Sequence, residues 1–199
     1  LHNPGRALSL HNHFLAKSLH LTRPGGMVVA LTSRYTLDAA DDTARRRLYE
    51  LGDLVGAVRL PERAHKELAG TEVITDVLVF RRREDHAPRG DARWLSIADI
   101  KTDSDIPVTI NRYFHANPEH VLGHIEPDVG RFGPELRVIA EHANDAAPLR
   151  DALASIARVA VTAGQGMTAR TIGADTDTSA VRAEDLTAAP DDVWEGTTL

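Results

Sequence analysis

An amphipathic run that ends in a glycine turn and continues directly as an apolar strand constrains this fold more than any other stretch. The run covers about residues 10–21, the turn is Pro24-Gly25-Gly26, and the strand is the β-branched segment 27–31. A helix that leads into a buried strand in this way is typical of α/β proteins whose sheet is covered on both faces. The sequence therefore predicts an α/β fold built on this helix and strand.

Two further apolar segments, residues 54–60 and 73–80, are predicted to be buried strands. The polar loop 62–70 between them is too short for a parallel crossover, so these two strands are expected to pair antiparallel. Because the apolar character of all three segments is continuous, we expect them to share one sheet that is covered on both faces. In that sheet residues 73–80 lie in the middle, antiparallel to both neighbours.

Two helices are predicted around the first strand. Ser9 is a candidate N-cap for the helix 10–21. The second helix, residues 42–51, is expected to end at Gly52 in the left-handed conformation. The apolar face of the first helix is expected to hold Phe14, Leu15 and Leu19.

The composition changes twice along the rest of the chain. The charged stretch 81–93, which contains Pro88 and Gly90, marks the edge of the first unit. After Thr162 the composition shifts to Thr, Ala, Asp and Gly, which predicts a flexible tail. We therefore expect three parts: a partial α/β domain, a small α+β extension and a linker or tail, at residues 1–85, 86–161 and 162–199.

The expected extension contains short elements. A short helix is predicted to begin at Asn117-Pro118, because Pro is favoured at the first helical position. A strand over residues 136–140 follows the turn 130–133, and a later helix is spaced by Leu149, Leu153, Ile156 and Ala160. In the tail, Gly164-Gln165-Gly166 is interpreted as linker, because no strand precedes it as a phosphate loop requires.

Polar residues follow the first strand at its carboxyl end. Ser33, Arg34 and Asp38 are the best-placed candidates for a site, because ligands of open α/β sheets bind outside the carboxyl ends of the strands. Arg34 is expected at the mouth of the crevice, where it could hold a phosphate. For Asp38 the alternative is a helix cap, a role that Asp41 and Asp42 fit better.

The charge pattern sets limits on nucleic-acid binding. A net charge of −6 argues against a free-standing basic clamp, because phosphate binding depends on clustered Lys and Arg. A local basic rim stays open, since arginines cluster at residues 45–47, 59–63 and 81–83. Arg59 and Arg63 lie near strand ends and could meet DNA phosphates; an ordinary surface salt bridge is the alternative for each.

Other site types are disfavoured by composition. The chain has no cysteine, which excludes disulfides and thiolate metal sites and makes a cytoplasmic location the expectation. Four histidines open the chain, yet helical spacing puts His13 and His20 about 10 Å apart, so no metal site is predicted. No apolar run reaches the length of a membrane span. Because the chain begins at Leu1 and has no signal sequence, we interpret it as an internal piece of a longer protein.

The ordered combination of short motifs resembles the carboxyl-terminal part of adenine-specific DNA methyltransferase domains. It is similar above all to those of large bacterial and phage proteins in which a methylase domain precedes a helicase. The resemblance covers about residues 8–139. The motifs that carry it are His11-Asn12-His13-Phe14, Lys17-Ser18, Arg23-Pro24-Gly25-Gly26, Leu31-Thr32-Ser33-Arg34, Gly56-Ala57-Val58-Arg59-Leu60-Pro61, Gly70-Thr71-Glu72, Thr75-Asp76, Asn111-Arg112-Tyr113-Phe114, Asn117-Pro118-Glu119 and Val121-Leu122-Gly123.

The resemblance implies the last three strands of a Rossmann-like sheet that binds S-adenosylmethionine, with the final strand antiparallel between its neighbours. It also implies an upstream methyltransferase half, DNA as partner, and a helicase domain downstream. The family's glycine-rich cofactor loop and its Asn-Pro-Pro-aromatic tetrad occur nowhere in this chain, and Asn3-Pro4 is followed by Gly5 and is predicted to be a turn. No catalytic or cofactor-binding residue is therefore assigned, and the chain alone is expected to be inactive.

Two other functional classes remain as alternatives. The first is a non-catalytic structural or docking module of a helicase-type DNA-remodelling protein that retains the sheet without its chemistry. The second is an α/β oxidoreductase or hydrolase, which the sequence disfavours because it has neither a Gly-x-Ser-x-Gly elbow nor a dinucleotide fingerprint.

Overall fold

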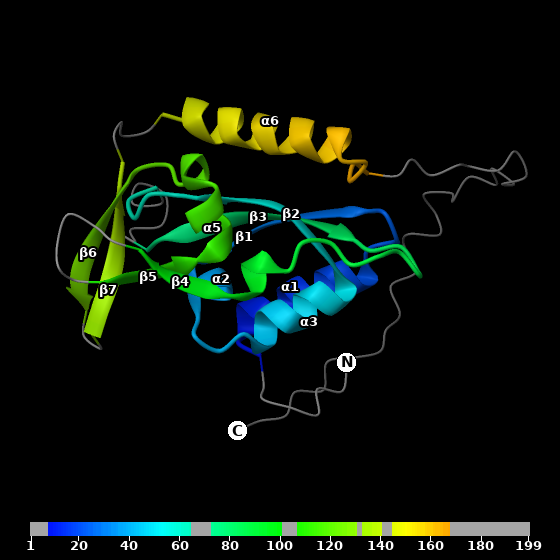
Figure 1. Ribbon diagram of the computed structural model, residues 1–199, viewed down its shortest axis with the longest axis horizontal. Coiled ribbons are helices and arrows are strands. Elements are labelled where there is room, and N and C mark those ends of the chain that lie inside the picture. The colour runs from blue at the N-terminus through cyan, green and yellow to red at the C-terminus, as the bar shows by residue number, and fades with distance from the viewer. Residues whose placement is uncertain (1–7, 65–72, 101–106, 131–132, 141–144, 168–199) are drawn as a thin grey trace, which may run out of the picture. The chain divides into compact units, whose positions relative to one another are not determined.

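The predicted helix, turn and strand form the start of the computed structural model (Figure 1) as α1 (Leu10–Leu21) and β1 (Met27–Ser33). Gly26 N donates to Arg23 O at 3.0 Å across the turn, and Gly25 has φ 73°. This is the geometry of a type II turn, which takes Pro second and needs a residue of positive φ third. Glycine at position 25 therefore fixes the direction in which β1 leaves the helix.

The structure describes residues 8–64, 73–100, 107–130, 133–140 and 145–167. All of them belong to the first of two units into which the chain divides, Leu1–Thr168. After β1 the first unit continues with α2 (Tyr35–Asp38), α3 (Thr43–Leu51), β2 (Gly52–Arg59) and β3 (Thr75–Arg82). The fold of the described residues is mixed α/β.

The three longest apolar strands form one sheet in the order β1-β3-β2. β3 lies in the middle and pairs antiparallel with both neighbours, which confirms the predicted arrangement. The bounds differ slightly from the prediction, because β2 and β3 begin at Gly52 and Thr75. Since β1 and β2 both oppose β3, they run in the same direction, and α2 and α3 connect them along the chain.

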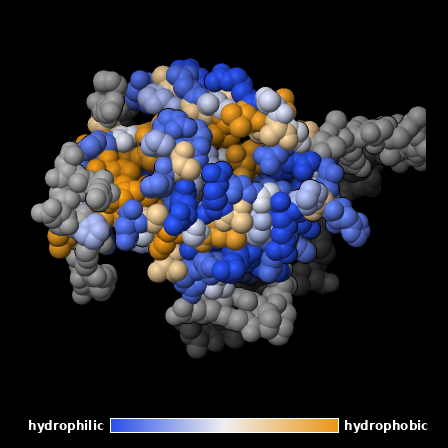
Figure 2. All heavy atoms as spheres, in the orientation of Figure 1, coloured by the Kyte–Doolittle hydropathy of each residue, from blue (hydrophilic) through white to orange (hydrophobic). Residues whose placement is uncertain are grey.

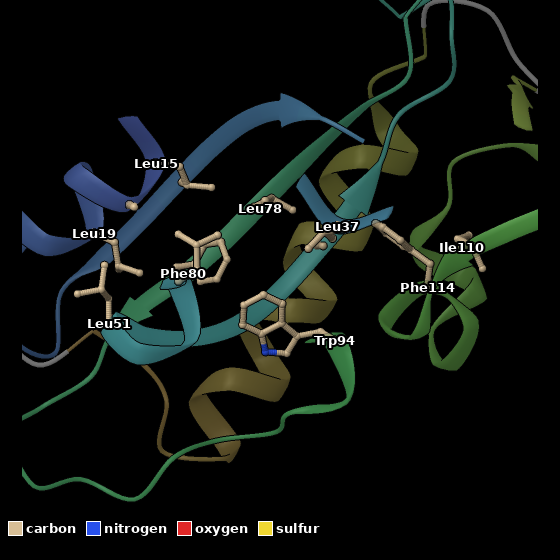
Figure 3. Packing of buried hydrophobic residues seen from close by; sticks show 12 residues of the cluster. Leu15, Leu19, Leu37, Leu51, Leu78, Phe80, Trp94, Ile110 and Phe114 are labelled. Atoms are coloured by element: carbon tan, nitrogen blue, oxygen red, sulfur yellow. The ribbon is translucent and has the colours of Figure 1, made fainter. Parts of the chain in front are cut away.

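The face of the sheet toward α1 and α3 carries the main core (Figure 3). Leu78 and Phe80 of β3 are fully buried at its centre. Helix α1 contributes Leu15 and Leu19 as predicted, whereas Phe14 is 57% exposed on the other side of the helix. Two large aromatic side chains of this core come from the extension, Trp94 and Phe114. Burial of this much apolar surface is the main force that holds the sheet and the extension together.

The opposite face of the sheet is covered by α6 (Ala147–Thr162), the helix predicted from the spacing of Leu149 through Ala160. Ile156 of α6 packs with Val58 of β2, and a Cβ on Gly56 would come within 2.5 Å of the Ile156 side chain. Glycine at position 56 therefore lets the helix approach the strand. In Figure 2 hydrophobic residues lie beneath the largely hydrophilic outer side of α6.

One edge of this sheet stays open among the described residues. β1 is a terminal strand, and its Val29 and Leu31 lie in register with Val79 and Val77 of β3. These two β1 side chains are 64% and 56% exposed, because α6 packs over β2 and β3. The sheet thus presents an apolar row beside a strand edge that has no partner in the described part of the chain.

The extension is built from two small antiparallel sheets. The first contains β4 (Ile97–Ile100) and β5 (Val108–Asn111), and the second is the hairpin of β6 (His124–Gly130) and β7 (Gly133–Ile139). The 3-10 turn η1 (Arg93–Leu95) precedes β4, and α5 (Arg112–Ala116) and η2 (Pro118–His120) connect the two sheets. The helix predicted at Asn117-Pro118 is the single 3-10 turn η2, and α5, with its Tyr113 and Phe114, was not predicted as a helix.

One local prediction was wrong, and two others lie wholly or partly outside the described residues. Gly52 is extended, with φ −166°, and starts β2 directly after α3. A Cβ at this position would collide with the Arg81 carbonyl of β3, so the glycine serves close strand packing rather than a left-handed cap. The expected turn at Asn3-Pro4 and residues 168–199 of the expected tail lie outside the described residues. Helix α6 ends in a turn at Gly164, φ 69°.

Candidate functional site

Four of the five predicted site residues gather where β1 and β2 end, and a polar cluster forms there. β1 ends at Ser33, Arg34 follows, Asp38 closes the one-turn helix α2, and Arg59 is the last residue of β2. Asp76, near the start of β3, lies opposite Arg59 in the strand register. Because this edge is the carboxyl end of two strands, it is where an α/β sheet places its ligands.

Arg59 is the centre of the cluster and has no exposed surface. Its Nε and Nη2 donate to the two carboxylate oxygens of Asp76 at 2.8 and 2.9 Å, and its Nη1 donates to Asp38 Oδ2 at 2.7 Å. The guanidinium lies 4.3 Å from the centre of the Phe114 ring. Arg34 Nη1 lies 3.6 Å from Asp38 Oδ2, so two guanidinium groups face two carboxylates.

The electrostatics keep Arg59 charged despite its burial. Burial alone would lower the pKa of Arg59, but the attraction of Asp76 and Asp38 outweighs it and raises the pKa. Burial also raises the pKa of the Asp76 carboxyl, and the ion pair with Arg59 opposes that rise. Arg59, Asp76 and Asp38 therefore form a closed set of opposite charges, which is costly to break.

Asp38 joins this cluster to the extension. Its Oδ1 accepts a hydrogen bond from Asn111 N at 3.0 Å, and the Asn111 amide donates to the carbonyls of Leu37 and Trp94 at 2.8 and 2.9 Å. Asp38 is thus neither a helix cap nor an open ligand group. The carboxylate of Asp41, in contrast, accepts from Thr43 N at 2.8 Å at the start of α3, while Asp42 occupies the N-cap position but makes no capping bond with its side chain.

Arg59 was expected to meet a DNA phosphate or, alternatively, to form a surface salt bridge. Neither expectation fits its position, because its guanidinium is enclosed by Asp76, Asp38 and Phe114. Arg63, the fifth predicted residue, is exposed in the turn after β2, apart from the cluster. Ser33 is partly buried, and its Oγ accepts from Tyr35 N at 3.4 Å.

Arginines from two of the predicted clusters bind backbone carbonyls within the fold instead of forming a basic rim at the surface. Arg45 is 1% exposed and donates to the carbonyls of Leu37, Ala39 and Leu95. Arg83 donates to the carbonyl oxygens of Tyr49 and Gly52 at the end of α3. A guanidinium carries five donors and can satisfy several carbonyls that a helix end leaves unpaired. Sequence spacing gave no sign of these bonds, because the partners lie 30 or more residues away in most cases.

A second, partly buried polar pair, Tyr113 and His120, was missed from the sequence. Tyr113 Oη lies 2.8 Å from His120 Nδ1, and their rings are stacked at 5.8 Å. Burial lowers the pKa of His120 and raises the pKa of Tyr113 to about 12. The bonded proton therefore belongs to the tyrosine at neutral pH, and the imidazole is a neutral acceptor.

Acidification should destabilise the protein in part through His120. Below pH 6.5, the ordinary pKa of histidine, the imidazole of residue 120 binds a proton in the unfolded chain. In the folded chain it binds that proton only when the pH falls to the lower pKa of His120. The free energy of unfolding should therefore fall as the pH drops from neutrality through that window. Urea denaturation across this pH range should show that the free energy of unfolding falls less steeply with falling pH in His120→Gln than in the parent chain. The same series on the exposed His115→Gln controls for loss of an imidazole elsewhere, and an unchanged slope in His120→Gln would refute the assignment.

Among the described residues no group of three or more His, Asp or Glu side chains is arranged to hold a metal ion. None of the described helices has both the length and the apolar character that crossing a membrane requires.

Comparison with family models, with curated proteins and with solved structures gave no match to the chain.

Proposed function

We propose that this chain is the carboxyl-terminal part of an adenine-specific DNA methyltransferase domain, which transfers a methyl group from S-adenosylmethionine to the exocyclic amine of adenine. The observation that carries the proposal is the order of the sheet. β1 and β2 run in the same direction, and β3 is inserted between them antiparallel to both. A Rossmann-like methyltransferase sheet, which the motif resemblance implies, ends in such an inserted strand.

The open edge of β1 supports an upstream half. An exposed strand edge that carries apolar side chains tends to recruit another strand unless it is covered. Val29 and Leu31 form such a row at the edge of this sheet. In the proposed whole domain, a strand of the upstream half pairs along β1, and upstream helices cover these two side chains. The same half brings the glycine-rich cofactor loop and the Asn-Pro-Pro-aromatic tetrad, which this chain does not contain.

In the proposed reaction the upstream tetrad holds the flipped adenine against the methyl donor. This chain supplies the wall of the crevice at the carboxyl ends of β1 and β2. The ion pairs of Asp38 with Arg59 and Arg34 hold α2 against the sheet, so the polar residues that follow β1 keep a fixed position. In this proposal Arg34, which directly follows β1, contacts a DNA phosphate, and a downstream helicase domain moves along the same DNA.

A second candidate function is a non-catalytic docking module in a helicase-type DNA-remodelling protein. One observation favours it: Arg59, expected at the crevice, is enclosed by ion pairs with Asp76 and with Asp38, which was also expected there. A module without catalytic activity still needs such ion pairs to stabilise its fold. The two proposals differ in what the upstream sequence must contain, since a methyltransferase needs the cofactor loop and the tetrad there.

Calorimetric titration with S-adenosylmethionine tests the proposal. The 199-residue chain should show no measurable binding, because the expected cofactor loop is absent from it. The protein obtained by extending the reading frame upstream of Leu1 should bind with a dissociation constant in the micromolar range, about −8 kcal/mol. Micromolar binding by the chain alone would mean that the cofactor site has been placed in the wrong half. Absence of binding by the extended protein would favour the docking module.

A further inference from the structure

A hollow of about 300 Å³ opens beside the polar cluster, between the first turn of α1, α2 and the start of α3. This volume is at the lower end of the range found for small-ligand pockets. Its lining combines an aromatic ring, Tyr35, with the apolar side chains of Leu8, Ala39 and Ala44. Two polar side chains, His11 and Asn12, reach it from α1. Ser9, Asp41 and Thr43 complete the lining, so the hollow suits a small planar molecule that carries polar atoms.

Asn12 is the buried polar group of this hollow, with 8% of its surface exposed. Its Oδ1 accepts a hydrogen bond from Thr36 Oγ1 at 2.9 Å, and Thr36 Oγ1 lies 2.8 Å from Thr32 Oγ1. This chain of bonds fixes the carboxamide, with Oδ1 turned to Thr36. Within the described residues Asn12 Nδ2 has no acceptor, so the donor available to the hollow is an amide N–H.

Tyr35 supplies a held aromatic surface that is still 49% exposed. Arg34 lies over its ring, 4.2 Å from the ring centre, and Arg34 Nη2 donates to Tyr35 Oη at 2.8 Å. A ring fixed in this way loses little freedom when a ligand stacks on its other face. Stacking on an aromatic side chain is the usual way in which proteins hold an unstacked base of a single strand.

The charge of the hollow disfavours an anionic ligand. An anion would meet the carboxylate of Asp41, which lies in the lining and already accepts from Thr43 N. A neutral heterocycle with a ring nitrogen or a carbonyl oxygen can accept a hydrogen bond from Asn12 Nδ2, and its flat face can stack on the Tyr35 ring.

We propose that this hollow receives one unstacked nucleobase of bound DNA, stacked on Tyr35 and accepting a hydrogen bond from Asn12 Nδ2. The identity of the polymer rests on the proposed function. The base site itself goes beyond it, because that function places the reacting adenine at a tetrad that this chain does not contain. The 199-residue chain should therefore bind a nucleoside without any upstream segment.

The test is a titration of the ¹⁵N-labelled 199-residue chain with adenosine, followed by amide chemical shifts. Shifts should move at His11, Asn12, Tyr35 and Ala39 and should saturate at millimolar adenosine. Tyr35→Ala should weaken binding about tenfold or more, as expected for loss of one stacking contact. Tyr35→Phe should bind within about threefold of the parent chain, because the stacking ring is kept. Phe14→Ala removes an exposed aromatic side chain of α1 that does not line the hollow and should change nothing.

Three results would overturn the inference. One is the absence of saturable shifts with adenosine in the folded chain. Another is equal binding of ribose 5-phosphate, which would mark a sugar or phosphate site. The third is unchanged adenosine affinity in Tyr35→Ala. The outcome is separable from the proposed function: adenosine binding here, with no methyl transfer by the extended protein, keeps the base site and removes the methyltransferase. Methyl transfer without adenosine binding does the reverse.

Discussion

Asp76→Asn should lower the free energy of unfolding by about 3 to 5 kcal/mol, the range for breaking a buried ion pair by removing one partner. Asp76 and Arg59 have no exposed surface, and two hydrogen bonds of 2.8 and 2.9 Å join them. The asparagine has nearly the same shape but leaves the guanidinium without a full counter-charge and turns an N–H₂ toward its donors. Since small domains have only about 5 to 15 kcal/mol of stability, this loss would remove a large part of it.

The matched control is an exposed pair on α3. Arg46 and Asp42 are joined at 2.7 Å, but the side chains are 66% and 35% exposed. Asp42→Asn should therefore cost no more than about 1 kcal/mol. Urea denaturation followed by circular dichroism measures both variants. Equal losses in the two variants would show that the Asp76 pair contributes as a surface salt bridge does, and the buried cluster would not be what holds the sheet edge together.

Trp94→Ala should cost a similar amount, about 3 to 5 kcal/mol, the usual loss for removing a large buried aromatic side chain. The Trp94 indole is 2% exposed and packs edge-on against Phe80 at 5.7 Å and Tyr49 at 6.1 Å (Figure 3 shows the Phe80 contact). Trp94 belongs to the extension, and Phe80 belongs to the sheet. The substitution should therefore destabilise both parts in one transition.

Circular dichroism and size-exclusion chromatography across a urea series test that expectation. A single transition shifted to lower urea is the expected result, and Phe14→Ala, at an exposed position, should stay within about 0.5 kcal/mol of the parent chain. Two separated transitions would contradict it, because the extension would then fold independently of the sheet.

The backbone of the sheet was predictable because local signals determine it. The Pro24-Gly25 turn, the β-branched run after it and the short loop before β3 each act over a few residues, and together they gave the strand order. The same local signals misplaced Phe14, since an apolar residue near the edge of a helical face can point either way.

The site was less predictable because its geometry depends on residues far apart in the chain. Ser33, Arg34, Asp38 and Arg59 were found as strand-end residues, which their positions alone indicate. That Arg59 is buried follows from its register with Asp76, 17 residues later, and Asp38 meets Asn111, 73 residues later. A carboxylate at the start of β3 opposite an arginine at the end of β2 was the one signal that could have revealed the pair.

The most direct test of the central claim is methyl transfer to DNA. The reading frame is extended upstream of Leu1, the resulting protein is incubated with DNA and S-adenosylmethionine, and the digested nucleosides are separated by mass spectrometry. We predict N6-methyladenine from the extended protein and none from the 199-residue chain. An extended protein that binds DNA but leaves every adenine unmethylated would contradict the assignment to an adenine-specific methyltransferase.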